Sequence, residues 1–154
     1  MKYLQLQGLS LLLFFICATT SAQNKIPINE PDLNKTKLFA SLPDKIPVDI
    51  NSLQSLLNAE SGKEVSLKLG QNTLNKFNGK VISKINTDNI HSVVIRSGNF
   101  NGATFTLSSS TQPNGTVKFT GRIISFQHGD LYELQNQNDQ YLLIKKNFYD
   151  LVNE

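Results

Sequence analysis

The sequence predicts an α+β domain in which one short N-terminal helix packs on a curved antiparallel sheet of six or seven strands. Three observations support this fold class: leucines at helical spacing near residue 50, period-two alternation through most of the remaining chain, and Gly- or Asn-rich turns between the alternating stretches. One amphipathic helix and a meandering sheet bury their apolar faces against each other. A small β-barrel, formed if the sheet closes on itself, is the alternative.

Residues 1–22 have the pattern of a cleavable export signal. Lys2 supplies the positive start, Leu11 to Ala18 form a short apolar run, and Thr20-Ser21-Ala22 offers small residues for cleavage. We therefore expect a secreted or periplasmic protein whose mature chain begins at Gln23.

Cys17 is the single cysteine of the chain and lies inside this signal. A lipid anchor on Cys17 is the alternative, although bulky Phe15 and Ile16 precede it where a lipoprotein signal needs a small residue. A chain that begins at Gln23 has no cysteine, so its fold is expected to depend on its core rather than on disulfides.

The mature chain is predicted to contain a lead-in and one domain. Residues 23–37 are polar, contain two prolines and show no periodicity, which is typical of a flexible segment. Residues 38–154 are long enough for a single globular β-rich domain. Near its start, Pro43 and Pro47 require extended backbone in the residues before them.

The helix is predicted to begin after Asp49, whose carboxylate can accept the free amide hydrogens of a first helical turn. Leu53, Leu56 and Leu57 then form one apolar stripe at helical spacing. Gly62 is expected to end the helix, because glycine adopts the left-handed conformation at low cost.

The remaining patterns predict strands. Val93-Val94-Ile95 is a continuous apolar run, which favours a central strand covered on both faces. Phe148, Leu151 and Val152 predict a short closing helical turn. The expected strands cover residues 65–69, 77–85, 91–97, 104–110, 116–126, 131–135 and 141–146.

Turn residues separate these strands. Asn114-Gly115 is the strongest hairpin signal, because this dipeptide readily takes the positive φ angles of a tight turn. His128-Gly129-Asp130 and Asn138-Asp139 are predicted to form two further turns. Gly121, which precedes the apolar pair Ile123-Ile124, is interpreted as a bulge or bend.

Charge argues against nucleic acid and membranes as partners. The formal net charge is +3, and Lys145-Lys146 is the one adjacent basic pair, so no basic stripe is present. No apolar run approaches the roughly 20 residues that a transmembrane helix needs. The protein is therefore not expected to bind nucleic acid or to span a membrane.

The sequence predicts a non-enzymatic protein with no catalytic, cofactor-binding or metal-binding residues. His128-Gly129-Asp130 with a hydroxyl from Ser108 to Ser110 leaves an unrecognised hydrolase as an alternative, but nothing marks an oxyanion site. His91 and His128 lack the clustered partners of zinc sites. The carboxylates available for glycosidase chemistry read as solvated surface groups: Glu60, Glu64, Asp130 and Glu133.

Five residues are candidates for binding a partner. Arg96 and Arg122 are the only arginines, each on a polar position of a predicted strand, where the two could pair on one sheet face. Covering apolar surface with their stems is the alternative role. Asn99, Phe100 and Asn101 lie in a predicted loop, and Phe100 is either an anchor for the partner or folded under the loop.

The order of these elements resembles the prodomains of secreted zinc metalloproteases. The resemblance covers about residues 46–107 and implies a stand-alone module that binds or restrains another exported protein, because no His-Glu-x-x-His zinc motif is present. It is carried by the helix Asp49–Asn58, the strand Glu64–Leu69, Phe77-Asn78-Gly79-Lys80-Val81, Ser92-Val93-Val94-Ile95-Arg96-Ser97 and Asn101-Gly102.

The leading hypothesis is an exported domain that binds a protein partner through its loops or a sheet edge, as an inhibitor or assembly factor. No cofactor is expected, and the sequence leaves the oligomeric state open. A carrier of a small apolar ligand is the alternative, because a curved sheet over a helix can enclose an apolar cavity. Its candidate lining residues are Phe77, Phe105, Phe119, Phe126 and Tyr132.

Overall fold

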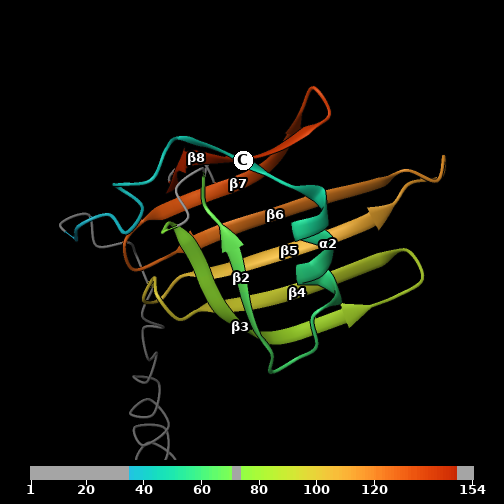
Figure 1. The fold of residues 1–154 in the computed structure, drawn as a ribbon, viewed down its shortest axis with the longest axis horizontal. Helices are drawn as coiled ribbons and strands as arrows, with labels where there is room; N and C mark the ends of the chain where they lie inside the picture. The colour runs from blue at the N-terminus through green and yellow to red at the C-terminus, as the bar shows by residue number, and fades with distance from the viewer. Residues whose placement is uncertain (1–34, 71–73, 149–154) are drawn as a thin grey trace, which may run out of the picture.

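The computed structural model describes residues 35–70 and 74–148. The predicted signal, residues 23–34 of the lead-in, and Leu151 and Val152 of the predicted closing turn lie outside the described residues. The described chain contains one helix, α2 (Ile50–Asn58), and eight strands (Figure 1). The strands are β1 (Lys45–Val48), β2 (Glu64–Lys68), β3 (Lys76–Asn86), β4 (Ile90–Ser97), β5 (Thr104–Thr111), β6 (Val117–Ser125), β7 (Asp130–Gln137) and β8 (Gln140–Asn147).

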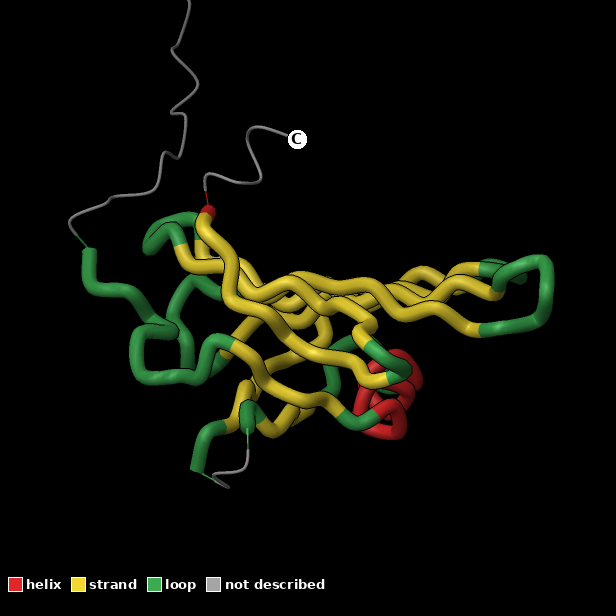
Figure 2. The backbone as a smooth tube through the Cα atoms, turned by 90° about the horizontal axis from the view of Figure 1, so that it is seen from above, coloured by secondary structure: helices red, strands yellow, loops and turns green. Residues whose placement is uncertain are grey.

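All eight strands form one antiparallel sheet that curls into a half-barrel (Figure 1 and Figure 2). β2 to β8 follow one another as a meander, and β1 pairs with β8. The predicted fold class is therefore confirmed, with eight strands rather than six or seven. The additional strand is β1, where Pro47 had indicated extended backbone alone. The strand order ends at β1 and β2, so the sheet is open and is not the closed barrel considered as the alternative.

Helix α2 lies on the concave face of the sheet, where it contacts β4 and β5 (Figure 1). The predicted N-cap is confirmed, because a carboxylate oxygen of Asp49 accepts the backbone N–H of Ser52 at 3.1 Å. The three predicted leucines, Leu53, Leu56 and Leu57, are buried. The predicted helix end is wrong: the helix stops at Asn58. Gly62, with φ +87°, instead lies in the next turn.

Residues 38–44 close the half-barrel beside the last residues of β2. The ring of Phe39 is buried, with its centroid 5.4 Å from that of Tyr132. The Tyr132 hydroxyl donates a hydrogen bond to the carbonyl of Pro43. An added Cβ at Gly70, two residues beyond the end of β2, would lie 4.0 Å from Cγ of Pro43, so the chain after β2 approaches the chain ahead of β1. This segment therefore supplies core that α2 alone does not.

The turns that join the strands are largely as predicted. Gly115 has φ +80° in the connection between β5 and β6, and Asn138 and Asp139 have φ 53° and 62° between β7 and β8. The predicted bulge at Gly121 is wrong, because the register of β6 with β5 continues through it without a shift. Gly121 is also where the pairing of β6 with β7 begins, opposite Leu134. Gly121 instead allows close packing: an added Cβ would lie 2.8 Å from the carbonyl oxygen of Thr106.

The register shift lies in β3, between Val81 and Ser83. The prediction of a strand covered on both faces also needs correction. Val93 and Ile95 are fully buried on the concave face, whereas Val94 is partly exposed on the convex face. One sheet over one helix forms a single core, so the convex face has no second layer within the described residues.

Alkaline pH is expected to weaken the closure by residues 38–44. Burial, followed by the negative charges of Asp44 and Asp130, raises the pKa of Tyr132. The folded protein then keeps a proton that the unfolded chain loses near pH 10, so the free energy of unfolding should fall as the pH rises above about 10. Tyr132→Phe should lower the free energy of unfolding by about 1 kcal/mol at neutral pH, because the hydrogen bond is lost. Above about pH 10, the free energy of unfolding of this variant should fall less steeply than that of the wild type. Urea unfolding from pH 8 to about 11 tests this, and equal declines in both proteins would contradict it.

Gly79 is expected to tolerate no side chain. A Cβ there would lie 2.5 Å from the carbonyl oxygen of Arg96 and 2.7 Å from Cγ2 of Ile95. Gly79→Ala should therefore lower the free energy of unfolding by about 1–3 kcal/mol, the usual cost of overpacking. The matched control is Gly98→Ala, because a Cβ there meets only the carbonyl oxygen of Asn78, at 3.8 Å. Chemical denaturation measures both variants, and a similar loss in the two would show that steric overlap is not the cause.

Candidate partner-binding edge

Strand β2 presents a free edge. Val81 N–H donates to the Lys63 carbonyl at 2.9 Å, and Leu69 N–H donates to the Asn75 carbonyl at 2.7 Å. Together with the register, these bonds show that the odd-numbered residues of β2 bond to β3. The N–H and C=O groups of Glu64, Ser66 and Lys68 therefore point away from the sheet, and no hydrogen bond joins them to another described residue.

The opposite edge of the sheet, β1, is protected. Lys145 N–H donates to the Asp44 carbonyl at 2.8 Å. The backbone N–H and C=O groups of Asp44, Ile46 and Val48 therefore point toward β8. The backbone groups of Lys45 and Pro47 point away from the sheet. Proline has no N–H, and its ring blocks an added strand at this position. The two edges therefore differ, and β2 is the one that can accept another chain.

A hollow of about 370 Å³ lies between the free edge of β2 and the first turns of α2. The buried side chain of Leu56 and the half-buried side chain of Val65 make its apolar part. Its polar rim carries hydroxyl and amide groups from Asn51, Ser52 and Ser55 and the capping carboxylate of Asp49, and Ser66 of β2 borders it. An extended segment added to β2 would therefore place alternate side chains in this hollow.

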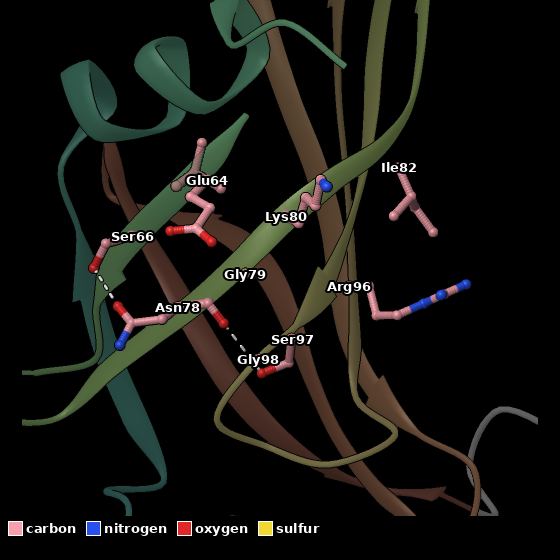
Figure 3. A pocket seen from close by; sticks show the side chains of 10 residues that line it. Glu64, Ser66, Asn78, Gly79, Lys80, Ile82, Arg96, Ser97 and Gly98 are labelled. Carbon is pink, nitrogen blue, oxygen red and sulfur yellow. Dashed lines mark hydrogen bonds between the residues drawn. The ribbon is translucent and has the colours of Figure 1, made fainter. Parts of the chain in front are cut away.

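A second hollow, of about 580 Å³, lies on the convex face of β2, β3 and β4 (Figure 3). The register places Glu64, Lys80 and Arg96 in one row across these strands. Neither Lys80 nor Arg96 has an ion-pair partner among the described residues. Beside them, Ser66 Oγ donates to Asn78 Oδ1 at 2.8 Å, as drawn in Figure 3. The free edge thus has a hollow on each side.

The two arginines share the convex face but do not lie together. Arg96 is opposite Thr104, whereas Arg122 is opposite Thr106 on the far side of β5. Arg122 instead pairs with Glu133 at 3.3 Å. Burial raises the pKa of the Glu133 carboxyl, but hydrogen bonds from Gln135 and Arg122 and nearby positive charges outweigh it, so that the pKa lies below its ordinary value. Arg122 is thus occupied in a structural pair, while Arg96 lines the second hollow.

The predicted binding loop is held against the body of the protein. The Asn99 side chain accepts Asn78 N–H at 2.9 Å and donates to the Lys76 carbonyl at 2.7 Å. Phe100 is folded under the loop, with its ring centroid 5.3 Å from that of Phe39. Asn101 is exposed. Of the three, Asn101 alone offers a solvated side chain without a described bond.

The residues considered for the hydrolase alternative make structural contacts. The Nδ1 atom of His128 lies 2.8 Å from the carbonyl oxygen of Thr36. The Asp130 carboxylate accepts the N–H of Leu38. Ser108 Oγ lies 2.7 Å from a serine hydroxyl on β4. His128 and Asp130 thus hold the N-terminal segment on the turn between β6 and β7, and no hydrogen bond joins Ser108 to either of them.

His91 and the aromatic residues considered for a ligand cavity also have structural surroundings. His91 Nδ1 lies 3.2 Å from the side-chain oxygen of Asn86. Across residues 35–70 and 74–148, no three His, Cys, Asp or Glu side chains gather in a way that could hold a metal ion. No helix in this part of the chain has the length and apolar character needed to cross a membrane. Four candidate cavity-lining aromatics, Phe77, Phe105, Phe119 and Tyr132, are buried in the core, and the fifth, Phe126, is 53% exposed.

The open edge was not identified from residue types. Glu64, Ser66 and Lys68 read as the solvated face of an ordinary strand, and their importance appears only when the strand order places β2 at the end of the sheet. The available signal was Pro47, because a proline inside a strand marks a protected edge and leaves the other edge to be examined.

No family model, no curated protein and no solved structure matches this chain. The resemblance to metalloprotease prodomains therefore stays a prediction.

Truncation of Phe100 is expected to affect stability, because its ring packs against Phe39 and Phe77. Phe100→Ala should lower the free energy of unfolding by about 2–4 kcal/mol, somewhat less than the roughly 3–5 kcal/mol for a fully buried ring, because Phe100 is half-buried. Asn101→Ala, its exposed neighbour, should change it by less than about 0.5 kcal/mol. Denaturant titration compares the two, and an unchanged Phe100→Ala would restore the view of Phe100 as an anchor for a partner.

Proposed function

We propose that this protein is a non-enzymatic, exported binding domain that accepts an extended segment of a protein partner as an added strand on β2. One observation supports the proposal most directly: β2 leaves the N–H and C=O groups of Glu64, Ser66 and Lys68 free, whereas Pro47 protects the other edge. Addition of a strand to an exposed edge supplies affinity through backbone hydrogen bonds and specificity through side-chain pockets.

The edge by itself supports modest affinity. Three residues each offer one donor and one acceptor, and each backbone hydrogen bond contributes about 0.5–1.5 kcal/mol net. Micromolar binding requires about 8 kcal/mol after the cost of ordering the segment. The remainder must come from side chains in the two hollows, so the hollow against Leu56 and Val65 favours segments with an apolar residue there.

Export and restraint of a partner belong to the same proposal. The predicted signal in residues 1–22 supports a location outside the cytoplasm, where the partner would also be an exported protein. The resemblance to metalloprotease prodomains favours an inhibitor or assembly factor, because such a module acts by holding another chain.

Ser66→Pro tests the site, since it removes an N–H that faces the free edge and places a proline ring where an added strand would lie. The bonds between β2 and β3 are retained, because Ser66 does not contribute to them. Displayed random peptides selected on the wild-type domain should bind Ser66→Pro at least about tenfold more weakly. The matched control is Lys45→Pro, which puts the same change on the outward side of β1 and should leave binding unchanged.

Amide hydrogen exchange supplies the second measurement. Bound peptide should slow exchange at Glu64, Ser66 and Lys68, whose N–H groups are free in the unbound domain. Equal weakening by both proline variants, or protection confined to another part of the domain, would show that β2 is not the binding element.

A further inference from the structure

The side chains along the free edge of β2 have a pattern of their own. Glu64, Ser66 and Lys68 are exposed and lie on the convex face, because side chains alternate along a strand and Val65 and Leu67 turn toward the core. An acidic residue therefore stands near one end of the edge and a basic residue near the other. Within the described residues, neither Glu64 nor Lys68 forms an ion pair.

The charges of Glu64 and Lys68 complement those of a second copy of β2 when the two strands pair antiparallel. If two copies of β2 pair antiparallel about a two-fold axis through Ser66, each Glu64 lies directly opposite the Lys68 of the other copy. The residues that face one another are then those whose N–H and C=O groups are free, as the hydrogen-bonded pairs of an antiparallel ladder require. On the other face, Val65 of one copy lies opposite Leu67 of the other.

Other arrangements lack this match. A parallel, in-register pair would place Glu64 against Glu64 and Lys68 against Lys68, and like charges directly opposite each other are destabilising. A two-fold contact is also self-complementary by definition, so a single favourable cross-strand pair occurs twice. Charge complementarity therefore selects both the orientation and the register.

We propose that a second copy of this chain caps the free edge of β2 in a reversible, two-fold dimer. The dimer would continue the sheet from one copy into the other and would occupy the same backbone groups that a partner segment needs. The competition between dimer and partner rests on the proposed function, whereas the dimer itself rests on the edge and its charges. Self-association thus keeps an exposed strand from non-specific pairing until a partner displaces the second copy.

The contact is short, so the dimer should be weak. Three free-edge residues on each side bury far less surface than a standard stable interface of about 1,200–2,000 Å². Sedimentation velocity on the chain from Gln23 should therefore show a monomer at low micromolar concentration and a growing dimer fraction toward about 1 mM. Pairing should slow amide exchange at Glu64, Ser66 and Lys68 as the concentration rises.

Charge reversal gives the sharpest test. Glu64→Lys and Lys68→Glu should each weaken self-association at least about tenfold, because like charges then lie opposite each other at both ends. The double variant Glu64→Lys/Lys68→Glu should recover dimerisation, since opposite charges again face each other. An equimolar mixture of the two single variants should form a mixed dimer for the same reason. The double variant and the mixture exclude misfolding as the cause of a loss.

Each result decides the proposal. A wild-type chain that stays monomeric at about 1 mM overturns it, as do single variants that dimerise like the wild type, or a double variant that does not recover. Peptide binding separates this outcome from the proposed function. If selected peptides protect Glu64, Ser66 and Lys68 while the chain remains monomeric, the dimer is wrong and the partner-binding function stands. If the dimer forms and no peptide binds, the dimer stands and the proposed partner-binding function is wrong.

Discussion

The fold depends on one constraint: a single short helix and residues 38–44 must cover the apolar face of a wide sheet. Helix α2 has nine residues and is therefore about 13–14 Å long, whereas eight flat strands would span about 34 Å. A flat sheet would leave most of its apolar face in water. Curling brings that face around the helix, and residues 38–44 contribute Phe39 and Leu42 to the remaining core. The half-barrel shape follows from this need to bury one face.

The same constraint creates the candidate site. The half-barrel encloses α2 and the N-terminal segment, and its sheet ends at β1 and β2 without closing on itself. Two strand edges therefore remain, each with backbone groups that need a partner or water. Pro47 protects one edge at no cost to the ladder, because its missing N–H would have faced outward. β2 has no such residue, and a hollow of about 370 Å³ lies between it and α2.

The candidate binding residues show what residue types predict and what they do not. An aromatic residue among Asn and Gly in a loop can be either an anchor for a partner or part of the core. Phe100 is part of the core because its ring packs against Phe39, which lies 61 positions earlier in the chain. Arg122 was a candidate for partner binding from its position in the strand, but the register places Glu133 opposite it and the two form an ion pair. Arg96 kept its exposed position because its neighbours across the strands are Lys80 and Thr104.

Local chemistry was enough to predict much of this protein. The cap at Asp49, the leucine stripe of α2, the tight turns at Asn114-Gly115 and Asn138-Asp139, and the alternation of the strands all depend on residues a few positions apart. Strand order, the bulge in β3 and the identity of the free edge depend on pairings between distant residues, such as β1 with β8. Periodicity determines which residues of a strand are buried, but any strand of the right pattern can lie at an edge. Only the strand order of the whole sheet decided that β2 lies at the unprotected end.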